Sequence, residues 1–208
     1  MIPRLCYWTD GERGRAGRDQ VDVIERLARG GVELVVLRER DWSAKQWSDC
    51  AERLTKLRAQ GLRVLASRRL DLARALELDG VQLGAESVGV AEARAFLGPR
   101  ACIGYSAHDP AEARRAADAG ASYVTLSPIF ATASKPGAEA RGCAWLAAAR
   151  AQLSTPVLAL GGMTPARVAE VRAAGAWGVV AISALGAAPD PEAAAREFRR
   201  ALADEERT

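Results

Sequence analysis

The chain has 208 residues and a formal net charge of +3, and 49% of its residues are hydrophobic against 26% charged. These proportions fit a globular domain with a sizeable core. The slight charge excess contains no run of like charges, which argues against a nucleic-acid or membrane role. No apolar run approaches membrane-spanning length, and the first residues lack a basic region followed by an apolar core. We therefore expect a cytoplasmic protein.

Cysteine usage points the same way. Cys6, Cys50, Cys102 and Cys143 form no Cys-x-x-Cys pair, and His108 is the single histidine. A structural zinc site is therefore not expected. The cysteines are predicted to be reduced, partly buried apolar residues.

Short apolar runs alternate with longer amphipathic stretches along the whole chain. Runs of this kind, rich in Val, Ile, Leu and Ala, are typical of strands covered on both faces. In chain order the predicted strands are Leu5–Thr9, Val32–Leu37, Arg63–Ser67, Gly80–Leu83, Cys102–Ser106, Tyr123–Phe130, Pro156–Gly161 and Gly178–Leu185.

The segments between the runs predict helices. Ser43 and Gln46 form a capping box, while Asp109, Thr164 and Asp190 each place a capping side chain before a proline at the first helical position. Glycine, which supplies the left-handed cap of a helix, recurs before the next strand. The predicted helix exits are Gly30-Gly31, Gly61, Gly120-Ala121 and Gly175-Ala176.

Eight alternating units favour an α/β fold, either a closed barrel or an open doubly wound sheet. An open sheet that binds dinucleotides carries a glycine fingerprint after its first strand, whereas this chain has Thr9-Asp10-Gly11-Glu12 there. We therefore predict a single (β/α)8 TIM barrel, with residues 1–208 forming one domain without a long linker.

In such a barrel, functional groups lie at the carboxyl ends of the strands. Arg38 and Arg40 end the second strand on one side and could clamp a phosphate or carboxylate, or else pair at the rim with Glu39. Ser67 ends the third strand, and Arg68 directly after it adds positive charge at the same mouth. His108, near the end of the fifth strand beyond Ser106, is the side chain best suited to proton transfer, although a lone histidine is often structural.

The last three strand ends predict anion binding. The loop after the sixth strand carries Thr132, Ser134 and Lys135, and it either closes over a ligand or is solvated. Gly161-Gly162 after the seventh strand and Ile182-Ser183 at the eighth occupy the usual phosphate site of this fold. The alternative for the two glycines is a tight turn.

Several of these stretches, taken together, resemble the thiamine-phosphate synthase/TenI family over nearly the whole chain. Their order and spacing carry the resemblance, since any one of them alone is weak. They are Tyr7-Trp8-Thr9-Asp10, Leu37-Arg38-Glu39-Arg40, Gly80-Val81-Gln82-Leu83-Gly84, Ile103-Gly104-Tyr105-Ser106-Ala107-His108, Tyr123 through Lys135, and Ala159-Leu160-Gly161-Gly162-Met163.

The resemblance implies a barrel of thiamine biosynthesis that binds thiazole phosphate, often as a homo-oligomer. Its synthase branch couples the thiazole to a pyrimidine diphosphate and needs Mg²⁺. Its TenI branch includes an enzyme that isomerises a carboxythiazole phosphate, and members with a suspected regulatory role.

This chain departs from the synthase pattern at the metal-binding positions. Ser67-Arg68 stands where synthases have Asn-Asp, Ser87 replaces a second aspartate, and Val36 replaces a glutamine. These changes remove the oxygen ligands that Mg²⁺ demands. The tautomerase pattern also fails at one place, because Pro128 occupies the position of its acid/base histidine.

The sequence therefore favours a TenI-like protein that binds a small phosphorylated thiazole and needs no cofactor. Gly161, Gly162 and Ser183 are expected to hold the phosphate, and Arg38, Arg40 and Lys135 a second anionic group. His108 and Lys135 are the candidate catalytic residues, with His108 carrying a proton if the protein is an enzyme. Further substrate contacts are predicted for Ser67, Arg68, Ser106, Thr132, Ser134 and Ile182. Two alternatives remain open: thiamine-phosphate synthase, the case in which Mg²⁺ is required or Arg68 replaces it, and a regulatory binding protein without catalysis.

Overall fold

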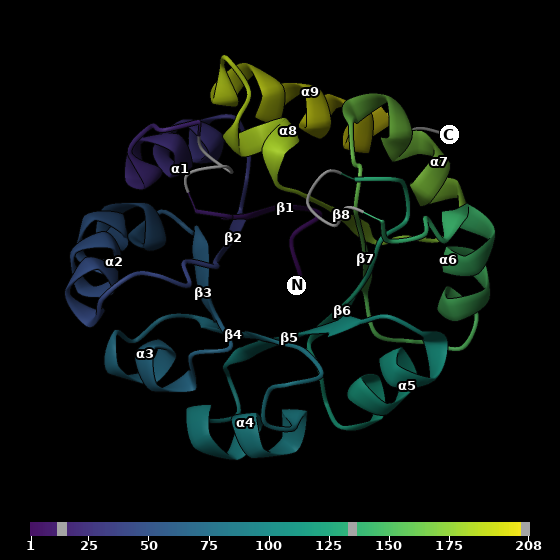
Figure 1. The fold of residues 1–208 in the computed structure, drawn as a ribbon, viewed down its shortest axis with the longest axis horizontal. Helices are drawn as coiled ribbons and strands as arrows, with labels where there is room; N and C mark the ends of the chain where they lie inside the picture. Colours follow the sequence, from purple (N-terminus) through teal and green to yellow (C-terminus); the bar gives the residue numbers. More distant parts are fainter. Residues whose placement is uncertain (12–15, 133–136, 205–208) are drawn as a thin grey trace.

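The computed structural model describes residues 1–11, 16–132 and 137–204, and it contains a closed barrel of eight parallel strands. Each strand pairs with the next one along the chain, and β8 closes the ring on β1. Looking into the barrel, Figure 1 shows the strands around the centre and the helices as an outer ring. The predicted TIM barrel is confirmed. The strands are β1 (Leu5–Trp8), β2 (Leu34–Leu37), β3 (Arg63–Ser67), β4 (Gly80–Leu83), β5 (Cys102–Ala107), β6 (Tyr123–Leu126), β7 (Val157–Leu160) and β8 (Gly178–Ala181).

A helix or helical turn follows each strand in the described chain. They are α1 (Gln20–Arg29), α2 (Ala44–Ala59), α3 (Leu70–Ala75), α4 (Val90–Leu97), α5 (Pro110–Asp118), α6 (Gly142–Arg150), η1 (Pro165–Arg167), α7 (Val168–Ala173), α8 (Ser183–Gly186) and α9 (Pro191–Asp204).

Two apolar layers follow from the alternation of side chains along each strand. Leu5 and Tyr7 of β1 point outward into the cluster shared with the helices, while Cys6 and Trp8 belong to the cluster inside the barrel. Most strand residues are fully buried because one layer covers each face. This explains why the strands read as continuous apolar runs.

Most predicted helix boundaries are confirmed. Ser43 and Gln46 form the capping box of α2, and the Asp109 carboxylate accepts the Glu112 backbone N–H at 2.7 Å. Thr164 is the exception, since its side chain makes no capping hydrogen bond and a 3₁₀ turn follows it. The glycines that return the chain from helix to strand have the expected left-handed φ, from 91° to 105° at Gly31, Gly61, Gly120 and Gly175.

Two predicted strands ended four residues too late, a larger error than at the other strands. β6 ends at Leu126 rather than Phe130, because Pro128 has no N–H to donate to a neighbouring strand. β8 ends at Ala181 rather than Leu185, because the chain turns at Ile182 into the short helix α8. Both corrections place polar groups at the mouth of the barrel instead of within the sheet.

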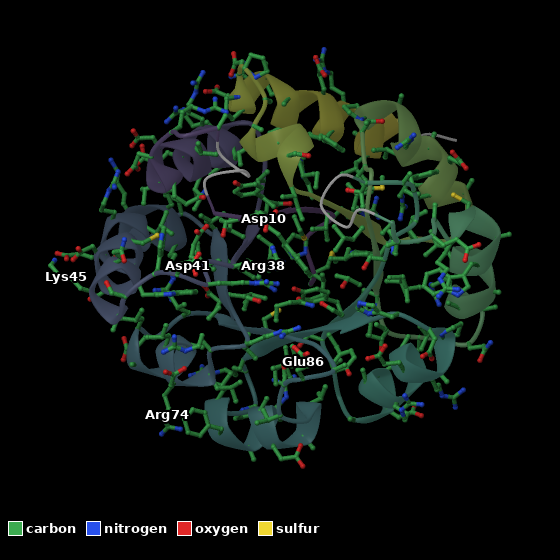
Figure 2. All side chains as sticks on the ribbon, in the orientation of Figure 1. Asp10, Arg38, Asp41, Lys45, Arg74 and Glu86 are labelled. Carbon is green, nitrogen blue, oxygen red and sulfur yellow. The ribbon has the colours of Figure 1, made fainter. Side chains whose placement is uncertain are left out.

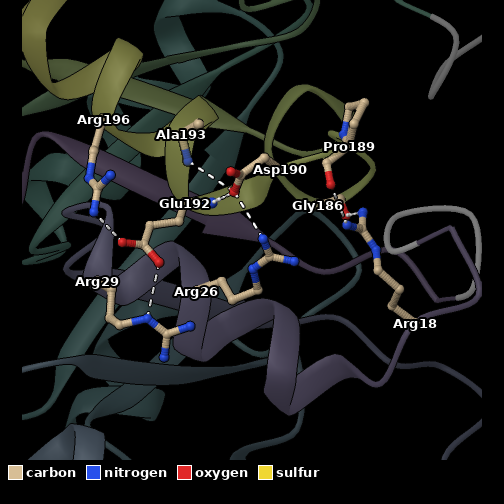
Figure 3. A network of polar contacts seen from close by, with 9 residues as sticks. All are labelled: Arg18, Arg26, Arg29, Gly186, Pro189, Asp190, Glu192, Ala193 and Arg196. Carbon is tan, nitrogen blue, oxygen red and sulfur yellow. Dashed lines mark hydrogen bonds and ion pairs between the residues drawn. The ribbon is translucent and has the colours of Figure 1, made fainter.

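Ion pairs join the first and last helices where the barrel closes (Figure 3). Arg26 of α1 donates to Asp190 at 3.1 Å, and Arg29 donates to Glu192 of α9 at 3.1 Å. Asp190 also caps α9 by accepting the backbone N–H groups of Glu192 and Ala193. Exposed pairs of this kind contribute little singly, so the closure depends mainly on the packing of α1 against α9.

Two further features concern the chain as a whole. Cys6, Cys50, Cys102 and Cys143 are free thiols, and burial raises the pKa of Cys50 to about 12 and that of Cys143 to about 11. Within the described ranges, no helix has the length and apolar character needed to cross a bilayer.

Candidate functional site

A cavity of about 580 Å³ opens where the strands end, at the mouth of the barrel. Most of the predicted site residues come together there, although their binding roles remain predictions. Ser134 and Lys135 lie outside the described residues. The predicted residues that line the cavity are Arg38, Arg40, Ser67, Arg68, Ser106, His108, Thr132, Gly161, Gly162, Ile182 and Ser183.

Gly161 and Gly162 form a corner of the cavity at the end of β7, and both have left-handed backbones with φ of 101° and 62°. A Cβ at Gly161 would lie 2.8 Å from Pro128 Cα, and one at Gly162 would lie 2.5 Å from the Ala131 carbonyl. Only glycine therefore fits between β7 and the loop after β6. Because the two glycines have no side chains, a ligand can also approach this backbone closely.

Ser183 lies beside this corner, at the start of the short helix α8. Its neighbour Ile182 precedes the helix with a non-helical backbone, φ −113° and ψ −89°. The first N–H groups of any helix lack partners within it, so the turn offers amide donors at its start. The glycine corner and the helical turn border the same cavity, and backbone amides of this kind are suited to binding an anion.

Arg38 is held at the mouth of the barrel, directly after β2. Its backbone N–H donates to Thr9 Oγ1 at 2.8 Å, and its guanidinium is paired with the Asp10 carboxylate. Figure 2 shows Asp10 and Arg38 on the inner side of the helix ring, whereas Lys45 and Arg74 lie at its periphery. Asp10 fixes the guanidinium in place, which reduces the entropy lost when a ligand binds.

Three more arginines surround this side of the cavity. Arg40 is exposed and has no ion-pair partner among the described residues. Arg68, with its backbone in the left-handed region at φ 62°, donates to Glu86 Oε2 at 2.6 Å. Arg69 donates twice to Asp71, and this bonding lowers the pKa of that carboxyl group. Four guanidinium groups therefore lie near the ends of β2 and β3, and three of them are paired with a carboxylate.

His108 lines the cavity from the loop after β5, and its side chain is 54% exposed. Its Nδ1 lies 4.0 Å from Glu112 Oε2, and its backbone N–H donates to the same oxygen at 2.7 Å. Glu112 also accepts the Tyr105 hydroxyl at 2.9 Å. The loop that carries the imidazole is thus tied to the start of α5.

The lining also includes residues that were not predicted as site residues, among them Trp8 and Gln82. The Trp8 indole N–H is buried without a hydrogen-bond partner in the described chain. Gln82 is 2% exposed and contacts Ser106. The signal that could have found them is strand alternation. It predicts that Trp8, the last residue of β1, and Gln82, the next-to-last residue of β4, point into the barrel.

The described residues offer no group of three or more His, Cys, Asp or Glu side chains that could hold a metal ion. Ser87 accepts the Gly84 backbone N–H at 3.0 Å and so closes a turn. Glu86, an acidic residue of the cavity lining, is paired with Arg68.

The chain matches a known protein family over most of its length. The TMP-TENI family, described as thiamine monophosphate synthase, matches residues 6–185. A thiamine-phosphate synthase of Methanoculleus marisnigri is 42% identical over 201 residues, covering 96% of this chain and 95% of that protein. A thiamine-phosphate synthase of Natronomonas pharaonis is 38% identical over 200 residues, covering 94% of each.

A solved structure has a closely similar backbone. Thiamine phosphate pyrophosphorylase from Pyrococcus furiosus superposes with a TM-score of 0.87 at 27% identity, covering 97% of this chain and 96% of that one. The similarity thus extends over the whole barrel, including the strand ends that form the cavity.

Proposed function

Because this chain belongs to the thiamine monophosphate synthase family, we propose that it forms thiamine phosphate from a thiazole phosphate and a pyrimidine diphosphate. Thiamine-phosphate synthase is the name carried by whole-length relatives near 40% identity. None of these comparisons distinguishes the TenI branch, which the departures in the sequence favoured. We therefore place the synthase reaction first.

The observation that carries the proposal is the pair of anion-binding regions in one cavity. An enzyme that joins two phosphorylated substrates needs both. The corner of Gly161, Gly162 and Ser183 suits the thiazole phosphate, and the arginines at the ends of β2 and β3 suit the diphosphate. Diphosphate is the leaving group, so guanidinium groups beside it stabilise the charge that develops as it departs.

Magnesium, which synthases of this family use, does not fit the residues present. Mg²⁺ requires oxygen ligands, usually one or two carboxylates with substrate phosphates. Arg68 occupies the strand end where synthases carry an aspartate, and Ser87 is bonded within its own turn. In this proposal Arg38, Arg40 and Arg68 supply the positive charge, and no step passes through a metal.

The test is to mix both precursors with purified protein and measure thiamine phosphate by chromatography, in EDTA and in excess Mg²⁺. We expect product in both, at rates within about twofold. No product in either condition would refute the synthase function. Product that depends strictly on Mg²⁺ would refute the role given to the arginines.

A second candidate is the isomerisation of a carboxythiazole phosphate, for which the specific observation is His108. It lines the cavity near a carboxylate, and a proton transfer of this kind needs an acid and a base but no metal. Pro128, at the position of the tautomerase histidine, cannot transfer a proton.

Conversion of the non-aromatic thiazole by the wild-type protein, lost in His108→Ala, would support this candidate. Synthase activity that survives His108→Ala would count against it. If the protein binds thiazole phosphate but catalyses neither reaction, it is a binding protein without catalysis.

A further inference from the structure

A glycine lets two buried polar side chains meet across three strands inside the barrel. Gln82 of β4, Gly104 of β5 and Tyr123 of β6 are successive register partners. A Cβ at position 104 would lie 2.1 Å from Gln82 Oε1 and 2.3 Å from Tyr123 Cζ. The bare Gly104 backbone therefore lets Tyr123 reach over β5, and its hydroxyl donates to Gln82 Oε1 at 2.5 Å.

This bond determines which way the Gln82 amide faces. Tyr123 is fully buried among apolar side chains and thiols, and Gln82 accepts the hydrogen bond from its hydroxyl. A buried hydroxyl left without an acceptor is costly, so its proton is directed to the amide oxygen. Burial also raises the pKa of Tyr123 well above its usual value, so the proton stays in place.

With the amide oxygen occupied, the amide nitrogen faces Ser106. Gln82 Nε2 donates to Ser106 Oγ at 3.1 Å. Ser106 lines the cavity, whereas Tyr123 does not. A serine hydroxyl has one proton, and because its oxygen accepts from the amide, that proton is available to a group in the cavity.

We propose that Tyr123 is a positioning residue, which holds the Gln82 amide so that the Ser106 hydroxyl donates to an acceptor atom of a bound heteroaromatic ring. This inference rests on the proposed function, and it deepens it by naming the part of the ligand that Ser106 recognises. Ser106 lines the cavity together with the apolar side chains of Trp8, Leu160 and Val180. Such surroundings suit an uncharged ring with a nitrogen acceptor rather than a phosphate.

The test is a double-mutant cycle of Tyr123→Phe and Ser106→Ala, with calorimetry of thiazole phosphate, pyrimidine diphosphate and inorganic phosphate. Each single variant should weaken binding of at least one ring-bearing precursor by about fivefold to tenfold, as expected for one hydrogen bond. Binding of inorganic phosphate, which has no ring, should change by less than about twofold. In the Ser106→Ala background, Tyr123→Phe should have no further effect on the precursor, because it acts through Ser106.

Tyr7→Phe provides a matched control. The Tyr7 hydroxyl also bonds a buried glutamine, accepting from Gln20 Nε2 at 3.3 Å, but this pair lies on the outer face of the barrel away from the cavity. Tyr7→Phe should lower the melting temperature without changing ligand affinity.

The outcomes separate this proposal from the synthase function. If the wild type forms thiamine phosphate while Tyr123→Phe binds as Tyr7→Phe does, the positioning role is wrong and the synthase function stands. If Tyr123→Phe weakens precursor binding but the wild type forms no thiamine phosphate, the positioning role stands and the synthase function is wrong. Additive effects of the two substitutions would also overturn the positioning role, and wild-type protein that binds neither precursor would overturn both proposals.

Discussion

Arg68 donates to the carboxylate of Glu86 over 2.6 Å, from the end of β3 to the loop after β4. The backbone of Arg68 is left-handed at φ 62°, a conformation that costs free energy for a residue with a Cβ. Its N–H compensates by donating to the Gln82 carbonyl at 2.9 Å. The strand end that would carry a metal ligand in a synthase thus carries a tethered cation.

Replacing Arg68 by alanine should weaken pyrimidine diphosphate binding about tenfold, because one charge-assisted contact to an anion is lost. Thiazole phosphate, which is expected at the corner of Gly161 and Gly162, should bind with an affinity within about twofold of that of the wild type. Calorimetry with each precursor measures both effects. Arg74→Ala is the control, since it removes an equal charge from the periphery of the molecule, where Arg74 lies over the Phe96 ring. Equal losses in the two variants would argue against a local contact.

Gly162→Ala should abolish most binding of thiazole phosphate. The added methyl would lie 2.5 Å from the Ala131 carbonyl, so the corner between β7 and the preceding loop must open. Gly61→Ala is the matched control: it also adds a methyl at a left-handed position, φ 102°, but meets nothing within 4 Å. Both variants should lose about 1 kcal/mol or more of stability from backbone strain. Gly61→Ala should retain wild-type affinity; a similar loss there would show that strain, not the corner, is responsible.

Gly104→Ala should destabilise the barrel by about 3 kcal/mol, in the upper range for overpacking. The clash involves Gln82 Oε1 at 2.1 Å and the Tyr123 ring, both buried, so neither can move away freely. Urea denaturation measures the change in the free energy of unfolding. Gly84→Ala, whose Cβ would lie 3.6 Å from Arg68 Nη2, is the comparison and should change stability little. A Gly104→Ala protein as stable as wild type would contradict the tight crossing of the three strands.

Asp19→Asn should reduce the amount of stability that the protein loses between neutral and acid pH. The Arg53 guanidinium, which donates to both carboxylate oxygens at 2.9 and 2.8 Å, holds the pKa of Asp19 below its usual value, and the backbone N–H of Asp22 adds to this. A carboxyl with a lower pKa in the folded state stabilises the fold above its unfolded pKa, near about 4, and that stabilisation disappears as pH falls through the folded value.

Melting temperatures between pH 7 and 2 test the Asp19 prediction. The difference in melting temperature between wild type and Asp19→Asn should be largest at pH 7 and should disappear toward pH 2. Asp49→Asn, which alters an exposed carboxylate paired with Lys45, should follow the wild-type curve. A gap that stays constant with pH would refute the ionic contribution of Asp19.

Several features of this protein were determined by the sequence alone. Strand and helix periods, capping side chains such as Ser43 and Asp109, and glycines at the helix exits are local properties. They predicted the barrel and placed most of the candidate site residues at the strand ends. Local patterns misjudged β6 and β8, because an apolar residue such as Ile129 reads alike in a strand and in a buried loop.

Tertiary structure decided which groups meet. Arg38 with Asp10, Arg68 with Glu86, and Tyr123 with Gln82 are separated by 28, 18 and 41 positions along the chain. No period links such pairs. They meet because barrel closure brings the strand ends around one axis, and because Gly104 leaves room for a side chain to cross its strand. That is why the sequence could place an arginine at the mouth but could not show its partner.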